Sequence, residues 1–193
     1  MKHIIDKKNY KLSYKIALFS ILFFISISIL NMIIMISDHS IYAELINKSG
    51  KQRMLSQRIA LLSTQHNKSY PTSLKSAILE IKKSHKFLIE RELSVELEKI
   101  YFKNTNNLNK LLNDFLDVSQ RYNINKNQKD LNQLMKLQNQ LVTLFDAVVL
   151  ELEIESKKFS DFMIIIEVVI MILIAILLYL ESIYIFNPIF KKI

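Results

Sequence analysis

One stretch of the sequence, between residues 43 and 64, carries side chains whose types and spacing could bind a small anion. The residues of this stripe follow one another at alternating steps of three and four, which places them on one side of an α-helix. They are small or polar: Ala43, Ile46, Gly50, Arg53, Gln57, Ala60 and Thr64. Small residues let two helix backbones approach closely, so the stripe predicts a two-fold pairing of this helix with its copy.

Gly50 supports this interpretation because it is the only glycine in the chain. A glycine inside a helix costs about 1 kcal/mol relative to alanine, and close helix approach is a reason to keep it. The alternative is a tolerated or kinked position. The predicted dimer interface consists of Ile46, Gly50, Arg53, Gln57 and Ala60.

Arg53 is the residue of this stripe that we expect to bind a ligand. In a two-fold pair it meets its own copy, and two buried guanidinium groups are costly unless an anion lies between them. The planar guanidinium fork suits carboxylate, phosphate or another oxyanion. We expect Gln57, Arg58 and Lys51 to surround the site, although Arg58 lies about 140° around the helix from Arg53. The alternative for Arg53 is an ion pair with Glu44 or another helix carboxylate.

The region that carries this stripe is helical in pattern throughout. Apolar residues recur at heptad spacing in four stretches. The seams are Ile41, Leu45, Gln52, Leu55, Ile59 and Leu62; Leu74, Ile78, Ile81, His85 and Leu88; Leu97, Tyr101, Asn104, Leu108, Leu111, Phe115, Val118 and Tyr122; and Leu131, Leu134, Gln138, Leu141, Phe145, Val148 and Leu152. Turn residues predict breaks at 67–72, at 91–94 with Ser94 as N-cap, and at 123–127. The predicted fold is all-α, an antiparallel four-helix bundle, with outer helices over 37–68 and 129–161.

Two charge-poor stretches flank this region and are long enough to cross a membrane as helices. The positive-inside rule places both Lys-rich ends in the cytoplasm of an inner-membrane protein, with the domain periplasmic or otherwise extracytoplasmic. Glu167 and Glu181 lie toward the ends of the second stretch, where acids can reach water or stay protonated. The expected organisation is a cytoplasmic tail (1–15), a first transmembrane helix (16–37), the sensor bundle (38–161), a second transmembrane helix (162–185) and a cytoplasmic stub (186–193).

Composition argues against several classes of function. The chain has 193 residues, one Gly, two Pro and no Cys, so neither a disulfide framework nor a thiolate metal site can form. Its histidines are scattered and no acidic pair is evident, so we predict no catalytic site, metal or cofactor. The net charge of +8 is spread over helix faces and carries no aromatic-interleaved basic motif, which argues against nucleic-acid binding.

The segment from Ile46 to Ala60 resembles the signature of the PilJ/NarX-type sensor domain family. The core of that signature is matched at Gly50, Arg53, Met54, Ser56 and Arg58. The resemblance implies a dimeric ligand sensor in which Arg53 corresponds to the arginine that grips nitrate between subunits in the nitrate-sensing branch. The segment from Arg53 to Arg58 looks more like the PilJ branch, and Lys51, Gln52, Leu55 and Gln57 differ from the nitrate-sensor version of the signature. The implied ligand is a small anion, either nitrate or nitrite or another oxyanion.

These observations lead to one principal functional hypothesis and two alternatives. The principal one is a receptor input module that binds a small anion at its dimer interface and signals across the membrane. Family members usually continue into a HAMP linker, and Pro188 resembles the start of that linker. We therefore expect a separate kinase or chemotaxis protein to provide the output. The first alternative is a structural or adaptor protein that binds another membrane protein without a ligand, and the second is a part of a split receptor.

Overall fold

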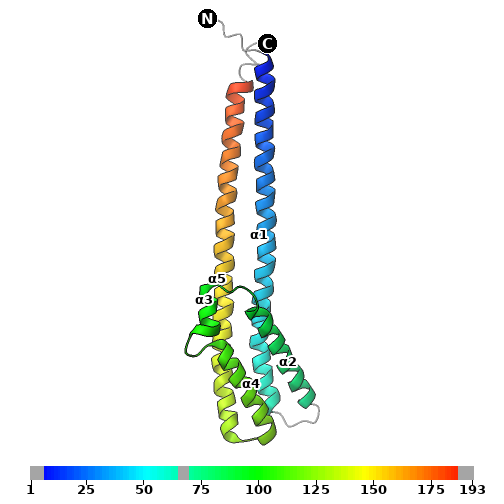
Figure 1. Ribbon diagram of the computed structural model, residues 1–193, viewed down its shortest axis with the longest axis vertical. Coiled ribbons are helices and arrows are strands. Elements are labelled where there is room, and N and C mark those ends of the chain that lie inside the picture. The colour runs from blue at the N-terminus through cyan, green and yellow to red at the C-terminus, as the bar shows by residue number, and fades with distance from the viewer. Residues whose placement is uncertain (1–6, 65–69, 187–193) are drawn as a thin grey trace. The chain divides into compact units, whose positions relative to one another are not determined.

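The computed structural model describes residues 7–64 and 70–186, and all regular structure in these ranges is helical. The helices are α1 (Lys7–Thr64), α2 (Tyr70–Ile89), α3 (Val95–Glu98), α4 (Leu108–Asn125) and α5 (Gln128–Glu181) (Figure 1). Two π-helical segments, η1 (Lys99–Lys103) and η2 (Ser182–Phe186), follow α3 and α5. The all-α class predicted from the sequence is confirmed.

The chain divides into two units. Residues 40–156 form the first, here called the helical domain, and residues 1–39 with 157–193 form the second, here called the two-helix unit. Both α1 and α5 contribute residues to each unit. Each unit is described separately below.

The helical domain has one hydrophobic core to which α1, α2, α4 and α5 all contribute. The predicted seams supply it, with fully buried side chains including Leu55, Ile59, Ile81, Leu108, Phe115, Leu134, Leu141 and Phe145. Polar contacts join the four helices in a ring. They are Lys51–Glu80 between α1 and α2, His85–Asn109 between α2 and α4, Arg121–Asp130 between α4 and α5, and Arg53–Asp146 between α5 and α1.

The predicted third helix is wrong in one respect, because it is not continuous from Leu97 to Tyr122. The chain leaves the helix after Lys103 and re-enters it at Leu108, and Asn104 is exposed. The Asn107 side chain caps α4 by accepting a hydrogen bond of 2.8 Å from the Lys110 N–H. Asparagine and threonine side chains compete with helical hydrogen bonding, which explains a break at residues 104–107 that the heptad spacing concealed.

Other predicted boundaries agree better with the structure. Ser94 is the N-cap of α3, as predicted, and accepts a hydrogen bond from Leu97 N–H. The predicted break at 123–127 is confirmed, because Lys126 adopts a left-handed conformation with φ of 50° between α4 and α5. The break predicted at 67–72 falls partly on residues 65–69, which lie outside the described residues. Because α2 begins at Tyr70, Pro71 occupies its first turn, where a missing N–H is tolerated.

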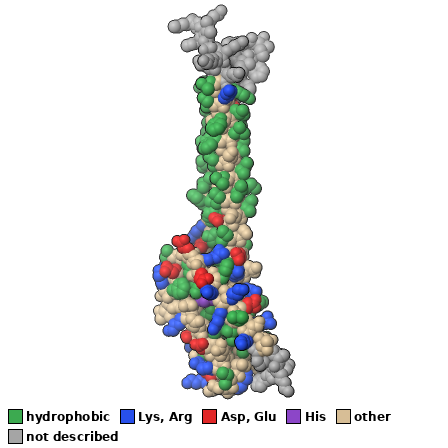
Figure 2. All heavy atoms as spheres, turned by 45° about the vertical axis from the view of Figure 1, so that its right-hand side comes forward, with side chains coloured by type: hydrophobic (Ala, Val, Ile, Leu, Met, Phe, Trp, Pro, Cys, Tyr) green, Lys and Arg blue, Asp and Glu red, His purple; other side chains and the backbone are tan. Residues whose placement is uncertain are grey.

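The two-helix unit exposes apolar side chains along both of its helices. Figure 2 shows hydrophobic side chains along its visible surface with few charged ones, whereas charged side chains gather over the helical domain. Both α1 and α5 contain stretches long and apolar enough to cross a membrane. The predictions made for residues 1–6 and for 187–193, including Pro188, lie outside the described residues.

Candidate functional site

The helix α1 divides the Ile46–Ala60 motif between two faces. Ser49, Gln52 and Ser56 have no exposed surface and point into the core beside Leu55 and Ile59. Gly50, Arg53, Met54, Gln57 and Arg58 are exposed. The motif therefore carries a buried polar row and, on the outside, the small and polar stripe described from the sequence.

Gly50 lies on an open part of this outer face. A Cβ atom built on Gly50 meets no other atom within 4 Å. Ile46 is partly buried against the core, whereas Ala60 belongs to the core and is only 4% exposed. The outer face of α1 available to a partner is consequently formed around Gly50, Arg53 and Gln57, with Ala60 contributing almost no surface.

Arg53 forms an ion pair with a carboxylate of α5, which is the alternative that the sequence left open. Its Nε lies 3.2 Å from Asp146 Oδ1, and both side chains are 48% exposed. Glu44, the other carboxylate considered, pairs instead with Lys48 and Arg91. The half-exposed Arg53 guanidinium forms no further ion pair with a described residue.

Lys51 does not share the Arg53 face. Residues two apart lie about 200° around a helix, and Lys51 Nζ contacts Glu80 Oε1 of α2 at 2.5 Å. Lys51 thereby lines a groove of about 720 Å³ between α1 and α2, together with Lys48, Lys83, Ser84 and Phe87. Of the four predicted ligand residues, the structure thus groups Arg53 with Gln57 and leaves Lys51 apart.

Gln57 and Arg58 occupy different surroundings. Gln57 lines a shallow hollow of about 250 Å³ between α1 and α5, with Ala60, Leu61, Met135 and Gln138 among its other walls. Arg58 is exposed and forms no ion pair with any described residue. Its guanidinium is therefore available to solvent or to a partner.

The buried polar row of α1 faces polar groups from two other elements. His85 of α2 lies 5.7 Å from the Tyr101 ring, centroid to centroid. Its Nε2 lies 3.0 Å from Asn109 Oδ1, an atom that can only accept, so Nε2 carries the proton. His85 Nδ1 and both polar atoms of the Gln52 amide are buried without a partner among the described residues.

Burial also changes the acid–base properties of this cluster. It lowers the pKa of His85 below the ordinary value, an effect that the bond to Asn109 partly opposes. It raises the pKa of Tyr101, an effect that the adjacent Ser49 hydroxyl partly opposes. The Ser49 and Tyr101 oxygens nevertheless complete no hydrogen bond of good geometry. Both shifts favour the neutral form of the side chain concerned.

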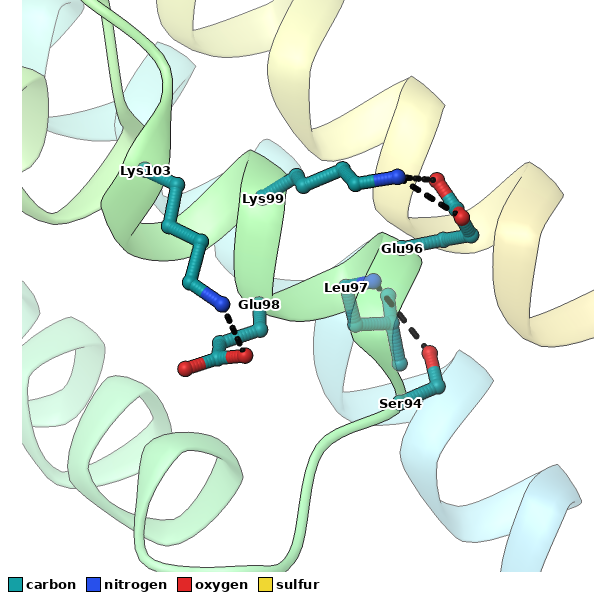
Figure 3. Close-up of polar contacts among 6 residues, drawn as sticks. All are labelled: Ser94, Glu96, Leu97, Glu98, Lys99 and Lys103. Atoms are coloured by element: carbon teal, nitrogen blue, oxygen red, sulfur yellow. Dashed lines mark hydrogen bonds and ion pairs between the residues drawn. The ribbon is translucent and has the colours of Figure 1, made fainter.

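Tyr101 reaches the core from an unusual backbone segment, the π-helix η1. Figure 3 shows how α3 and η1 are tied together by Ser94, which caps Leu97, and by the pairs Lys99–Glu96 and Lys103–Glu98. π-Helical turns are rare, and they shift the phase of the helix. The following side chains therefore point in a different direction from those of a regular α-helix. The spacing of apolar residues did not predict η1, and it identified Tyr101 only as a seam residue.

Within the ranges that the structure describes, no three His, Asp or Glu side chains gather where they could hold a metal ion. The described residues thus combine an all-helical domain with two helices long and apolar enough to cross a membrane.

The chain belongs to the PilJ family, the N-terminal domain of type IV pili methyl-accepting chemotaxis transducers, whose model matches residues 36–147. The match includes the whole Ile46–Ala60 motif, so the PilJ part of the resemblance is confirmed. This family is sensory and non-enzymatic. No curated protein and no solved structure matches the chain.

Proposed function

We propose that the chain is a membrane-anchored sensor that binds a small anion between two subunits and passes the signal to a separate kinase or chemotaxis protein. The observation that carries this proposal is the open outer face of α1, where Arg53 lies one turn beyond Gly50. That face lies within the segment matched by the PilJ family.

The proposed topology has two transmembrane helices and both termini in the cytoplasm. The spans are residues 16–37 and 162–185, and residues 38–161 form the sensor domain outside the inner membrane. The apolar, exposed surface of the two-helix unit supports the spans, and the lysines before the first and after the second support the orientation. A reporter fused at Ile193 that is active outside the cell would contradict this topology.

Within the sensor domain we propose an antiparallel arrangement of the four helices. Residue numbers along contacting helices run in opposite directions, which supports it. Lys48 O accepts from the Ser84 hydroxyl, whereas Lys51, further along α1, pairs with Glu80, which is earlier in α2. The connection between α4 and α5 is only two residues long, which also favours antiparallel neighbours.

The proposed ligand site lies where the outer faces of two α1 helices meet. Close approach at Gly50 brings the two Arg53 side chains together, and an oxyanion between them offsets their repulsion. Gln57 lies one turn further along this face, and Arg58 adds positive charge from the side. Nitrate or nitrite, as in the NarX-type branch, and small carboxylates are the ligands of matching charge and size.

Asp146 competes with the anion for Arg53. An ion pair between two half-exposed side chains contributes about 0.2 to 1 kcal/mol, whereas a bidentate oxyanion uses more of the guanidinium donors. We infer that Asp146 neutralises Arg53 in the empty sensor and is displaced when the anion binds. Because the anion displaces one such pair in each subunit, removal of Asp146 is expected to strengthen anion binding by up to about 30-fold, the equivalent of about 2 kcal/mol.

Calorimetry on the full chain in lipid nanodiscs tests the site, with nitrate, nitrite and acetate as probes. We expect Arg53→Ala to abolish binding, Asp146→Asn to tighten it, and Arg58→Ala to weaken it less than Arg53→Ala does. Unchanged binding by Arg53→Ala would place the site elsewhere. If the unmodified chain binds none of the probes, the adaptor function becomes the better hypothesis.

A further inference from the structure

The two-helix unit contains a polar cluster within otherwise apolar stretches, toward the start of the second stretch. Ser28 and Asn31 of α1 face Glu167 of α5. The Ser28 hydroxyl donates to Glu167 Oε1, and Asn31 Nδ2 lies 3.1 Å from Glu167 Oε2. Asn31 Nδ2 also lies 3.3 Å from the Met163 carbonyl oxygen, and Asn31 is only 9% exposed. Both carboxyl oxygens of Glu167 are therefore hydrogen-bonded to the other helix.

The spacing of these residues suits contact between two helices. Ser28 and Asn31 are three residues apart, and Met163 and Glu167 are four apart, so each pair lies on one face of its helix. The other serines nearby behave differently. Ser20 and Ser26 donate to carbonyls of their own helix, at Ile16 and Leu22. Among the described polar residues between 16 and 37 of α1, Ser28 and Asn31 bond to α5; beyond this stretch, His39 also contacts Ser160 of α5.

The cluster can hold the Glu167 side chain in either protonation state. An ionised carboxylate accepts from both Ser28 and Asn31. A protonated carboxyl can donate its proton to the Ser28 hydroxyl, which also accepts, while its other oxygen still accepts from Asn31. No arrangement leaves the carboxyl unpaired in hydrocarbon, where an unsatisfied polar group is especially costly.

We propose that Ser28, Asn31 and Glu167 form an interspan clamp that sets the resting register of the two membrane-spanning helices within one subunit. One turn of a helix is a rise of about 5.4 Å, so a slide of one turn separates the donors from the carboxyl oxygens. A signal that slides α1 against α5 by that distance must therefore break the clamp. This inference depends on the proposed function only in placing the two helices across a membrane.

Cross-linking in nanodiscs tests the clamp, because the chain has no native cysteine. His39→Cys and Ser160→Cys provide a reporter pair, since His39 Nε2 and Ser160 Oγ lie 3.1 Å apart. The rate is measured with a short thiol-to-thiol cross-linker on the full chain. We expect Glu167→Leu and Asn31→Leu to slow the reaction about five- to tenfold, as the loss of two interhelical hydrogen bonds of average strength implies.

Two matched variants make the result specific. Glu167→Gln keeps both partners, because its carbonyl accepts from Asn31 and its amide donates to Ser28, so it should cross-link at the native rate. Ser26→Ala removes a hydroxyl that bonds only within α1, so it should also have no effect. If Glu167→Leu fails to insert, Asn31→Leu and Glu167→Gln still decide the outcome.

The clamp is refuted if Asn31→Leu cross-links as fast as the parent, or if Glu167→Gln is as slow as Asn31→Leu. Anion binding, measured separately on the same samples, reports on Arg53 and not on the clamp. If the parent binds no anion but Asn31→Leu slows cross-linking, the proposed ligand is contradicted and the clamp is supported.

Discussion

Substitution of Gly50 separates the stability of a subunit from the stability of the proposed dimer. Gly50 lies in the interior of α1, and a Cβ atom at this position meets nothing within 4 Å. Replacing glycine by alanine inside a helix stabilises it by about 1 kcal/mol. Because no atom of the same subunit opposes the new methyl group, Gly50→Ala should raise the free energy of unfolding by about that amount.

A larger side chain at the same position should weaken the dimer. Leucine is also a good helix former, so Gly50→Leu is expected to leave the subunit as stable as the parent or more stable. At a close helix contact, however, overpacking costs about 1 to 3 kcal/mol. That cost corresponds to an increase of about 5- to 150-fold in the dimer Kd. The two effects have opposite signs, so a folding defect cannot be mistaken for a loss of the interface.

The assay follows both quantities on the full chain in detergent. Dilution of donor- and acceptor-labelled subunits gives the dimer Kd, and circular dichroism during chemical unfolding gives subunit stability. Asn113→Leu, which adds a similar apolar side chain to an exposed position of α4, is the matched control and should leave the dimer Kd unchanged. A native chain that is monomeric at high concentration, or a Gly50→Leu variant with the parent Kd, would refute the interface.

Two further predictions concern the core of the helical domain. Burial lowers the pKa of His85 below 6.5, so unfolding lets His85 take up a proton, and stability should fall as pH drops from about 6.5 towards the lower folded-state pKa. His85→Gln should therefore reduce the dependence of the thermal unfolding temperature on pH. If the variant shows the same pH dependence as the parent, other groups cause it. Phe115 is fully buried, so Phe115→Ala should destabilise the domain by about 3 to 5 kcal/mol in chemical unfolding, whereas Phe102→Ala, at a position 41% exposed, should cost much less.

Much of the helical domain could be predicted from the spacing of apolar residues. A seam residue such as Leu55 or Phe145 recurs every three or four positions, and only one face of a helix can satisfy that spacing while burying them. The Ser94 cap was readable for the same local reason, since Ser94 bonds to a backbone N–H only three residues away. The break before Leu108 was missed because the heptad spacing continues across it, although the Asn-rich turn at residues 104–107 was a visible signal.

The motif around Arg53 was also recognisable from the sequence, and the family match agrees with it. Helix geometry alone separated Arg53 from Arg58, because their angular spacing depends only on their numbers. The same geometry separates Lys51 from Arg53. It does not, however, predict which neighbouring helix each side chain contacts. The partner of Arg53 is 93 positions further along the chain, at Asp146, and only packing brings the two together.

The sequence by itself therefore determined the helices, the apolar spans and the motif, because these depend on side chains a few positions apart. The tertiary structure alone decided which surfaces became free and which polar groups became paired. It placed Ala60 in the core, exposed Gly50, and gave Glu167 two donors from α1. Contacts between distant segments depend on the rotation and register of each helix against its neighbours, and a shift of one residue turns a helix by about 100° and exchanges one set of contacts for another.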